Sequence, residues 1–286
     1  MKISQILQGR SWLVCGLTLS LLMGGCSQEQ HPYQLYKAYY ADHLRDLELI
    51  DQAGDERGVA DFDVDYASLP DFSTIEDTRA RKQAFFDYLR PAVEYRNEVN
   101  RERRLLLGAV RLKLEHGLEL DYPETLFLAN MRSYYKVPEE TSDLDALDVL
   151  DRRLDVIPPS LALAQAAIES GWGRSRFARE ANNLFGQWCF EAGCGVVPGR
   201  RQQGATHEVA SFESVDQAIA AYFRNINTHP VYAPVRAIRL QARSSDQPIN
   251  GLEMAAGLER YSERGEVYID EVREMIRFND LESGSG

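Results

Sequence analysis

Leu163-Ala164-Gln165-Ala166-Ala167-Ile168-Glu169-Ser170-Gly171-Trp172-Gly173 is the stretch that decides the fold. It follows Pro158-Pro159-Ser160, where proline fixes the entry of a helix. Apolar positions then recur at helical spacing, and the alanines allow close packing against neighbouring helices. Gly171 and Gly173 end the helix, because glycine adopts the left-handed conformation that closes a helix. The pattern predicts a buried helix with Glu169 in its last turn.

Glu169 occupies an unusual position for an acidic residue. The last turn of a helix leaves carbonyl groups unpaired, and their negative partial charge disfavours a carboxylate. Helix stability therefore does not account for Glu169, whereas a protonated, proton-donating carboxyl fits the position. The alternative is a surface acid or a buried structural ion pair, since perturbed carboxylates are often structural.

Composition and charge limit the classes of function. The 286 residues are 44% hydrophobic and 27% charged, which is enough for one catalytic domain with an extension. The formal net charge is −12, with 44 acidic against 32 basic residues. Nucleic acid is thereby disfavoured as a partner.

The first 25 residues are typical of a signal peptide. Lys2 and Arg10 precede an apolar run over 12–23 that is too short to cross a membrane, and small residues follow it. The stretch Leu22-Met23-Gly24-Gly25-Cys26 resembles a bacterial lipobox, in which Cys26 carries the lipid anchor. We expect an envelope or periplasmic protein, anchored as an outer-membrane lipoprotein; the alternative is an ordinary secreted protein with an incidental cysteine.

Two further cysteines, Cys189 and Cys194, lie close together in the exported part of the chain. Cysteines in an oxidising compartment usually pair, so the spacing predicts a disulfide. A zinc site would need more ligands, and the five histidines are scattered. No metal is therefore expected.

The remaining patterns predict a mainly α, α+β chain. Residues 26–72 are polar and indicate a tether, and residues 73–135 indicate a helical extension in which Pro91 kinks or divides a long helix. A catalytic domain over 136–282 follows, with a loose tail at 283–286. Glycines and short valine-containing stretches between Gly186 and Phe212 predict a small hairpin. Further helices are expected at 124–135, 142–150, 175–181, 215–226, 234–241, 251–260 and 267–278.

The motif around Glu169, followed by Asn183-Leu184-Phe185-Gly186, resembles glycoside hydrolase family 73, whose members are exported N-acetylglucosaminidases. The runs Trp188-Cys189-Phe190, Thr206-His207-Glu208-Val209 and Tyr261-Ser262-Glu263-Arg264-Gly265 resemble the Bax-type glucosaminidase branch of that family. The resemblance covers about 130–280. It implies a lysozyme-like fold with a helical lobe and a small β-lobe on either side of a glycan-binding groove.

The resemblance also implies roles for three residues. Glu169 is the catalytic acid, which protonates the leaving oxygen as the glycosidic bond breaks. Glu208 is the candidate for a second carboxylate on the hairpin, with Glu191 as the fallback and a solvated strand residue as the alternative. Tyr261 matches a family tyrosine near the acid, where its phenol would orient substrate or water; the alternative is half-buried packing.

Three residues are candidates for binding the substrate. Trp172 and Trp188 offer flat faces suited to sugar rings, although aromatic residues beside glycines also fill cores, as expected for Phe185. Asn183 has donors and acceptors for an N-acetyl group, or for the backbone of its own loop.

These observations predict a peptidoglycan hydrolase that cleaves the β-1,4 bond between N-acetylglucosamine and N-acetylmuramic acid and needs no cofactor. One alternative is a muramidase or lytic transglycosylase, which attacks the neighbouring linkage in the same kind of frame. Another is a non-catalytic envelope lipoprotein that binds glycan, with residues 27–150 as an interaction arm.

Overall fold

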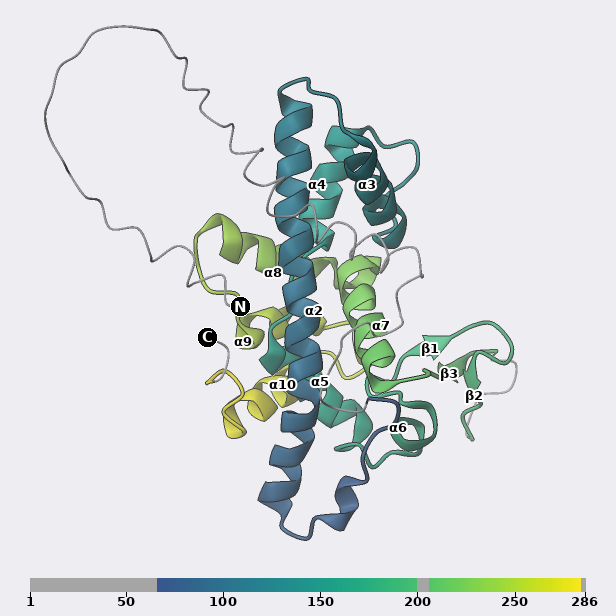
Figure 1. Cartoon of the computed structure of the whole chain (residues 1–286). Helices are drawn as coiled ribbons and strands as arrows, with labels where there is room; N and C mark the ends of the chain where they lie inside the picture. Colours follow the sequence, from purple (N-terminus) through teal and green to yellow (C-terminus); the bar gives the residue numbers. More distant parts are fainter. Residues whose placement is uncertain (1–65, 200–205, 284–286) are drawn as a thin grey trace, which may run out of the picture.

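The computed structural model describes residues 66–199 and 206–283 and is mainly helical with one small sheet (Figure 1). The predicted α+β class, mainly α, is confirmed. The α-helices are α2 (Thr78–Glu115), α3 (Tyr122–Tyr134), α4 (Asp143–Arg153), α5 (Pro159–Ser170), α6 (Arg176–Ala181), α7 (Val215–Thr228), α8 (Ala233–Ser244), α9 (Gly251–Met254) and α10 (Glu266–Phe278). Short 3₁₀ helices are η2 (Phe72–Thr74), η3 (Pro230–Tyr232) and η4 (Ala255–Leu258).

The predicted signal peptide over 1–25, the lipidation candidate Cys26 and most of the predicted tether lie outside the described residues. None of the described helices combines the length and the apolarity that spanning a membrane requires.

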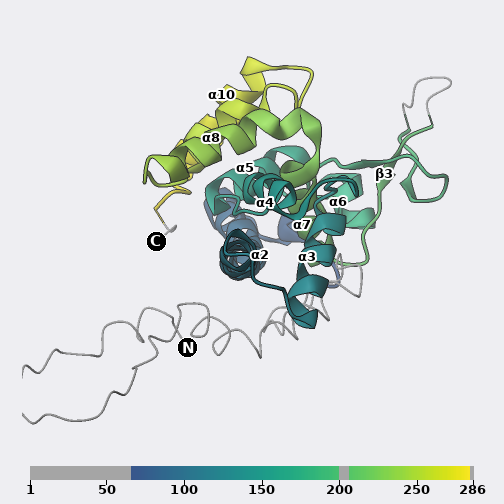
Figure 2. The same ribbon diagram turned by 90° about the horizontal axis from the view of Figure 1, so that it is seen from above.

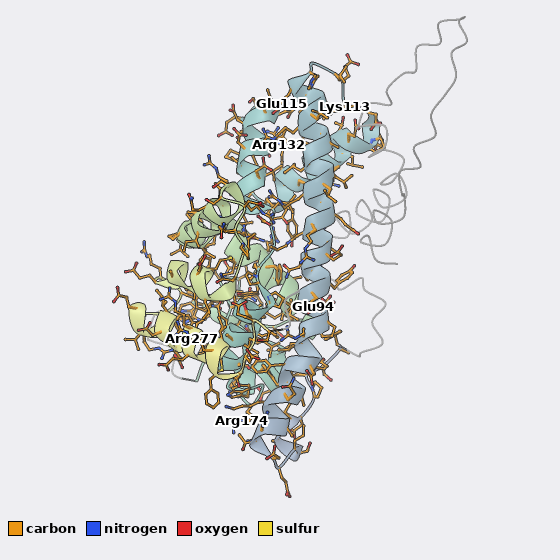
Figure 3. All side chains as sticks on the ribbon, turned by 90° about the vertical axis from the view of Figure 1, so that its left-hand side faces the viewer. Glu94, Lys113, Glu115, Arg132, Arg174 and Arg277 are labelled. Carbon is orange, nitrogen blue, oxygen red and sulfur yellow. A yellow bond between two sulfur atoms is a disulfide. The ribbon has the colours of Figure 1, made fainter. Side chains whose placement is uncertain are left out.

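The longest helix, α2, runs the length of the molecule (Figure 3). Glu94 is exposed on it, whereas Lys113 is largely buried and pairs with Glu124 of α3. Pro91 lies inside α2 and does not divide the helix, so of the two expectations the division is wrong and the kink stays a prediction. Proline in a helix interior costs about 3 kcal/mol. Pro91 itself is exposed, whereas the neighbouring Ala92 and Val93 are buried in the core, and their packing offsets that cost.

Two apolar clusters hold the helices together. The N-terminal half of α2 packs in one cluster with α5, α7 and α10. Its C-terminal half packs in a second cluster with α3 and α4. Both clusters therefore contain residues from either side of the predicted boundary between residues 135 and 136. That division into extension and domain stays a prediction.

The helix that carries Glu169 begins and ends as its sequence predicts. Pro159 is its first residue, and Gly171 closes it in the left-handed conformation with φ of 56°. Trp172 and Gly173 continue with positive φ. Three consecutive residues with positive φ turn the chain sharply away, so the helix stops at Ser170, one residue after Glu169.

The predicted hairpin is a three-stranded antiparallel sheet in the order β1-β3-β2. Its strands are β1 (Trp188–Cys189), β2 (Gly195–Val196) and β3 (Glu208–Ala210). Strand β3 pairs with both neighbours, which places Glu208 opposite Cys189. Cys189 and Cys194 form the expected disulfide. The sheet extends from the helices as a separate small lobe (Figure 1).

The extended segment Asp155–Ile157 leads into α5 and is fixed by side chains from two helices. Asn97 of α2 donates to the Ile157 carbonyl at 2.7 Å and accepts from the Ile157 amide at 2.8 Å. Asn100 of α2 and Asn227 of α7 donate to the Asp155 carbonyl at 3.0 and 3.1 Å. These buried side-chain amides thus supply the hydrogen bonds that a neighbouring β-strand would otherwise give to the backbone of the segment.

The Asp155 carboxylate adds charge to this anchor. It is buried and pairs with Arg243, with Arg239 at 3.5 Å and with Arg104 at 3.7 Å. Burial by itself would raise the pKa of Asp155, but these three guanidinium groups outweigh it and lower the pKa. The group therefore contributes stability at neutral pH, and this stability is lost as the pH falls through the lowered pKa.

We predict that Asp155→Asn lowers the free energy of unfolding at neutral pH by about 3–5 kcal/mol, because it leaves buried guanidinium charge uncompensated. Urea unfolding monitored by circular dichroism measures the loss. Asp143→Asn is the matched control, since Asp143 also pairs with an arginine, Arg132 at 2.6 Å, but its side chain is 53% exposed. We expect the control to lose less than about 1 kcal/mol. Equal losses in both variants would contradict the role of Asp155 as a buried carboxylate that stabilises the fold.

Candidate active site

Glu169 lies half-buried at the end of α5, where the loop Asn183–Gly186 meets its carboxyl. Gly186 has φ of +63°, and a Cβ atom added there would lie 3.4 Å from Glu169 Oε2. The last glycine of the loop is therefore required twice, for its left-handed backbone and for its closeness to the carboxyl. The two halves of the sequence motif, the helix end that carries Glu169 and the loop Asn183–Gly186, therefore meet at Gly186.

A line of buried hydrogen bonds runs from Glu169 into the core. The Tyr268 hydroxyl of α10 hydrogen-bonds the Glu169 carboxyl and accepts from Gln165 Nε2 at 3.1 Å. Gln165 Oε1 in turn accepts from the Tyr222 hydroxyl of α7 at 2.7 Å. Gln165 and Glu169 are one helical turn apart, so both face the same side of α5. The line therefore fixes the carboxyl relative to three helices.

The environment of Glu169 favours its neutral form. Burial raises the pKa of Glu169, and the nearby charge of Glu271 raises it further. The hydrogen bond from Tyr268 and the charge of Arg264 act in the opposite direction but do not cancel the effect of burial. The carboxyl consequently keeps its proton to a higher pH than an ordinary glutamate does.

Tyrosine rings surround this carboxyl. Tyr261 stacks on Tyr268 with ring centroids 5.3 Å apart, and Tyr232 lies 5.7 Å from Tyr261. Burial raises the pKa of Tyr261 well above its ordinary value, and the charge of Glu169 adds to this effect. Burial and the charge of Glu169 also raise the pKa of Tyr232, against a hydrogen bond to Asn225, to about 12. The structure thus brings the predicted Tyr261 to the site of Glu169.

The hydroxyl of Tyr261 is used on the protein itself. It donates to the Phe185 carbonyl at 2.9 Å, and the Phe185 ring stacks on Tyr222 at 4.1 Å. Tyr261 therefore holds the loop that approaches Glu169. A contact between Tyr261 and substrate stays a prediction.

Sequence reasoning missed Tyr268, Tyr222 and Gln165 as members of the site. By their spacing alone, the two tyrosines fall on the apolar faces of the helices predicted at 215–226 and 267–278. A lone glutamine among the alanines and leucines of α5 was the available signal, because a buried amide needs partners.

Trp172 lies on the far side of the turn from the sheet, against α2. Its ring is 5.2 Å from Phe86 and 5.8 Å from Phe85, and the Lys82 ammonium lies 4.6 Å above it. These contacts are those of a packing residue, which was the alternative to sugar binding. The substrate-binding role of Trp172 stays a prediction.

Asn183 is 2% exposed, and its amide is saturated by the backbone. It donates to the carbonyls of Gln187 and Ala210, both at 2.8 Å, and accepts from the Gln187 amide at 3.0 Å. The asparagine thereby ties its loop to strand β3. This is the backbone role that the sequence left open beside a substrate contact.

The sheet presents exposed aromatic surface. Trp188 is 59% exposed and stacks on His207 with centroids 4.1 Å apart and an interplanar angle of 9°. Phe190 next to it is 72% exposed. Large exposed rings are rare on proteins unless they contact a ligand or partner. Trp188 is thus available for the sugar contact that the sequence predicts.

Glu208 lies at the centre of the sheet and is 7% exposed. Its two oxygens accept from the amides of Gly193, at 3.1 Å, and Gly195, at 2.9 Å. The carboxylate therefore closes the loop that the disulfide spans. The fallback, Glu191, is exposed within the same loop.

Glu208 also lies within 4.8 Å of the sulfur atoms of Cys189 and Cys194, a spacing compact enough for a metal ion. The two sulfurs are joined to each other, and the thiolate form that binds zinc is not present in a disulfide. The donor set does not fit a metal centre.

Comparison with known proteins places this site in a family. Residues 145–281 match the family model described as mannosyl-glycoprotein endo-beta-N-acetylglucosaminidase, a segment that contains Glu169, the loop beneath it and the sheet. The chain belongs to this glucosaminidase family, and its domain is glycan-hydrolase-like.

Within the family, the chain is similar to "Protein bax" of Escherichia coli (strain K12), so the predicted Bax-type resemblance is confirmed. The two are 32% identical over 215 residues, which cover 74% of this chain and 75% of that protein. No solved structure matches the chain significantly.

We predict that Glu169→Gln stabilises the fold in a pH-dependent way. The folded-state pKa is raised, so the native carboxyl retains a proton that the unfolded chain releases. Wild-type stability therefore falls as the pH rises from the ordinary glutamate range through the raised pKa. Glutamine cannot ionise and escapes this loss. The difference in free energy of unfolding between variant and wild type should increase with pH over that window.

Denaturant unfolding at a series of pH values measures this difference. Glu191→Gln, which alters an exposed carboxyl, is the control. A difference for Glu169→Gln that is flat with pH, or that decreases as the pH rises, would refute the assignment.

Proposed function

We propose that the protein hydrolyses the β-1,4 bond between N-acetylglucosamine and N-acetylmuramic acid in peptidoglycan, with Glu169 as the general acid and without a metal or organic cofactor. The single observation that carries the proposal is the half-buried carboxyl of Glu169 at the end of α5, whose pKa is raised by burial. A glycosidic oxygen must be protonated as its bond breaks towards an oxocarbenium-like transition state. A carboxyl that keeps its proton to a higher pH than an ordinary glutamate is suited to that step.

The substrate class follows from two further observations. The family model that matches residues 145–281 is described as an endo-beta-N-acetylglucosaminidase, which supports a linkage at N-acetylglucosamine. The lipobox-like sequence ending at Cys26 supports export and an outer-membrane lipid anchor. An exported enzyme of this class reaches peptidoglycan in the envelope, and we therefore propose a periplasmic location.

The exposed rings of the sheet support a place for the glycan. Trp188 and Phe190 offer apolar faces of the kind on which sugar rings stack. They belong to the small lobe, whereas Glu169 belongs to the helices. A strand bound between the lobes would present its scissile bond to Glu169.

Glu208 is our candidate for the second carboxylate, which activates water or stabilises the cation. The amides of Gly193 and Gly195 bind its two oxygens and favour the anionic form by charge-assisted hydrogen bonds. One acid with a raised pKa and a second carboxyl that accepts two amide hydrogen bonds match the pair that such hydrolysis uses.

The same two hydrogen bonds favour a second candidate function. If these hydrogen bonds prevent the Glu208 carboxylate from acting on water, Glu169 acts alone, as in a muramidase or lytic transglycosylase. That mechanism would release muramic acid or anhydro-muramic acid ends.

The first prediction of the proposal concerns the bond that is cut. Wild-type protein should digest purified sacculi and release fragments whose new reducing ends are N-acetylglucosamine, as read by mass spectrometry after borohydride reduction. Reducing muramic acid or anhydro-muramic ends would establish the alternative linkage. Glu169→Gln should lower the rate by at least about 100-fold, the usual contribution of a general acid. Undiminished digestion by that variant would exclude Glu169 as the general acid, and no digestion by the wild type would leave a glycan-binding protein.

Glu208→Gln separates a catalytic carboxylate from one that only closes the loop. Glutamine has one oxygen acceptor, so one of the two amide bonds is lost in either case. The melting temperature therefore falls whichever role Glu208 has, and the activity decides between the roles. If Glu208 acts on water, we expect kcat, assayed well below the melting temperature, to fall at least about 100-fold with little change in KM. Retention of most of the activity would assign Glu208 to the loop and favour the single-acid mechanism.

Gly186→Ala tests the contact between the loop and the acid. Its matched control is Gly117→Ala, because Gly117 has φ of +66° with nothing near its added Cβ and lies just after α2. Both variants should lose about 1–2 kcal/mol of stability from the left-handed backbone. Only Gly186→Ala should also lose activity, since its methyl group crowds Glu169 Oε2. Equal activities in thermally matched assays would contradict the closeness of the loop.

A further inference from the structure

A cavity of about 390 Å³ lies between α4 and α8, apart from the catalytic cluster. Three arginines line it: Arg152 and Arg153 from α4, and Arg236 from α8. The rest of the lining is apolar and includes Val149 and Leu240. No acidic side chain is among the described residues that line the cavity.

Two of these arginines are held in place by backbone carbonyls. Arg153 donates to the carbonyls of Tyr135–Lys136 at 2.7 and 2.8 Å. Arg236 donates to those of Ile226, at 2.7 Å, and His229, at 3.0 Å. Burial and then the charge of Arg153 lower the pKa of Arg236 to about 10, which leaves it charged at neutral pH. Carbonyls orient a guanidinium group but do not neutralise it, so the cavity is positive.

The cavity is unusual on this chain. The chain has 44 acidic and 32 basic residues, and this net negative charge repels anions at long range. A concave site with fixed guanidinium groups and apolar walls selects a small anion that also carries apolar atoms. Guanidinium groups bind carboxylates in a planar, two-pronged geometry.

The cavity and the candidate active site are connected through one segment of the chain. Ala233 lines the cavity and opens α8, and the phenol of the preceding residue, Tyr232, responds to the charge of Glu169. Helices α4 and α8 are in contact (Figure 2). A substituent of a glycan bound at Glu169 would have to extend along α8 to enter the cavity.

We propose that this cavity binds a carboxylate of the peptide substituents carried by the glycan strand. The proposal rests on the proposed function and extends it, since it makes the peptide part of what the enzyme recognises. The peptides of peptidoglycan combine carboxylates with methyl side chains, which match the guanidinium groups and the apolar walls.

Arg152 is the residue to change, because its side chain is exposed and its loss does not disturb the fold. Arg152→Gln should raise KM for peptide-bearing strands about threefold, as for a partly exposed ion pair, and Arg152→Glu more, with kcat unchanged. Peptide-free strands, prepared with an amidase, should show no change in either constant. Arg277→Gln is the control, since Arg277 is exposed on α10 (Figure 3). Equal KM changes on both substrates, or none on either, would overturn the proposal.

A binding experiment keeps the test independent of catalysis. The acidic peptides released by the amidase are titrated into the full-length protein and its Arg152→Glu variant by calorimetry, with inorganic phosphate as a second probe. We expect the peptides to bind the wild type several-fold more tightly than the variant and phosphate not to compete. Competition by phosphate would make the cavity a general anion site, and peptide binding unaffected by Arg152→Glu would place it elsewhere; either overturns the proposal. Failure of the proposed function itself appears differently, as no new reducing ends from either kind of strand.

Discussion

The free-energy cost of burying the Glu169 carboxyl is the constraint on which the arrangement of this site depends. A carboxyl in an aromatic environment needs a hydrogen-bond partner, and Tyr268 supplies it. Tyr268 is itself buried and needs Gln165, which needs Tyr222. Helices α5, α7 and α10 must therefore keep a fixed relation to one another if all these polar groups are to remain satisfied.

The fold meets this requirement by fixing both ends of α5. At its start, Asp155 and the amides of Asn97 and Asn100 hold the incoming segment against α2. At its end, Gly171 turns the chain away and the loop through Gly186 closes over the carboxyl. Strong stabilisation at one end of the helix thus supports an energetically unfavourable group at the other, a combination common at functional sites.

Local patterns predicted most of the secondary structure. The helix stop at Gly171 and the Cys189–Cys194 disulfide each depend on neighbours in the sequence. Nonlocal effects could not be predicted in the same way. Pro91 stays inside α2 because distant helices pack beside it. The sequence predicts a hairpin and not the third strand, because each strand of the sheet contains only two or three residues.

The sequence predicted some residues of the candidate site and missed others. The sequence motif pointed to Glu169 and Tyr261, and both lie in one cluster. The partners of Glu169 come from positions about 50 and 100 residues further along the chain, and no spacing rule connects them. Trp172 and Asn183 are close to Glu169 in sequence. The direction of their side chains after a left-handed residue, however, depends on packing against α2 and β3.

The site depends on a Glu169 carboxyl that holds its proton to a higher pH than an ordinary glutamate does. A pH titration of ¹³C-labelled glutamate side chains by NMR measures this property, with Glu169→Gln used to assign the resonance. We expect the Glu169 carboxyl to titrate at a pH above that of an ordinary glutamate. Titration of that resonance at or below the ordinary glutamate pKa would contradict it.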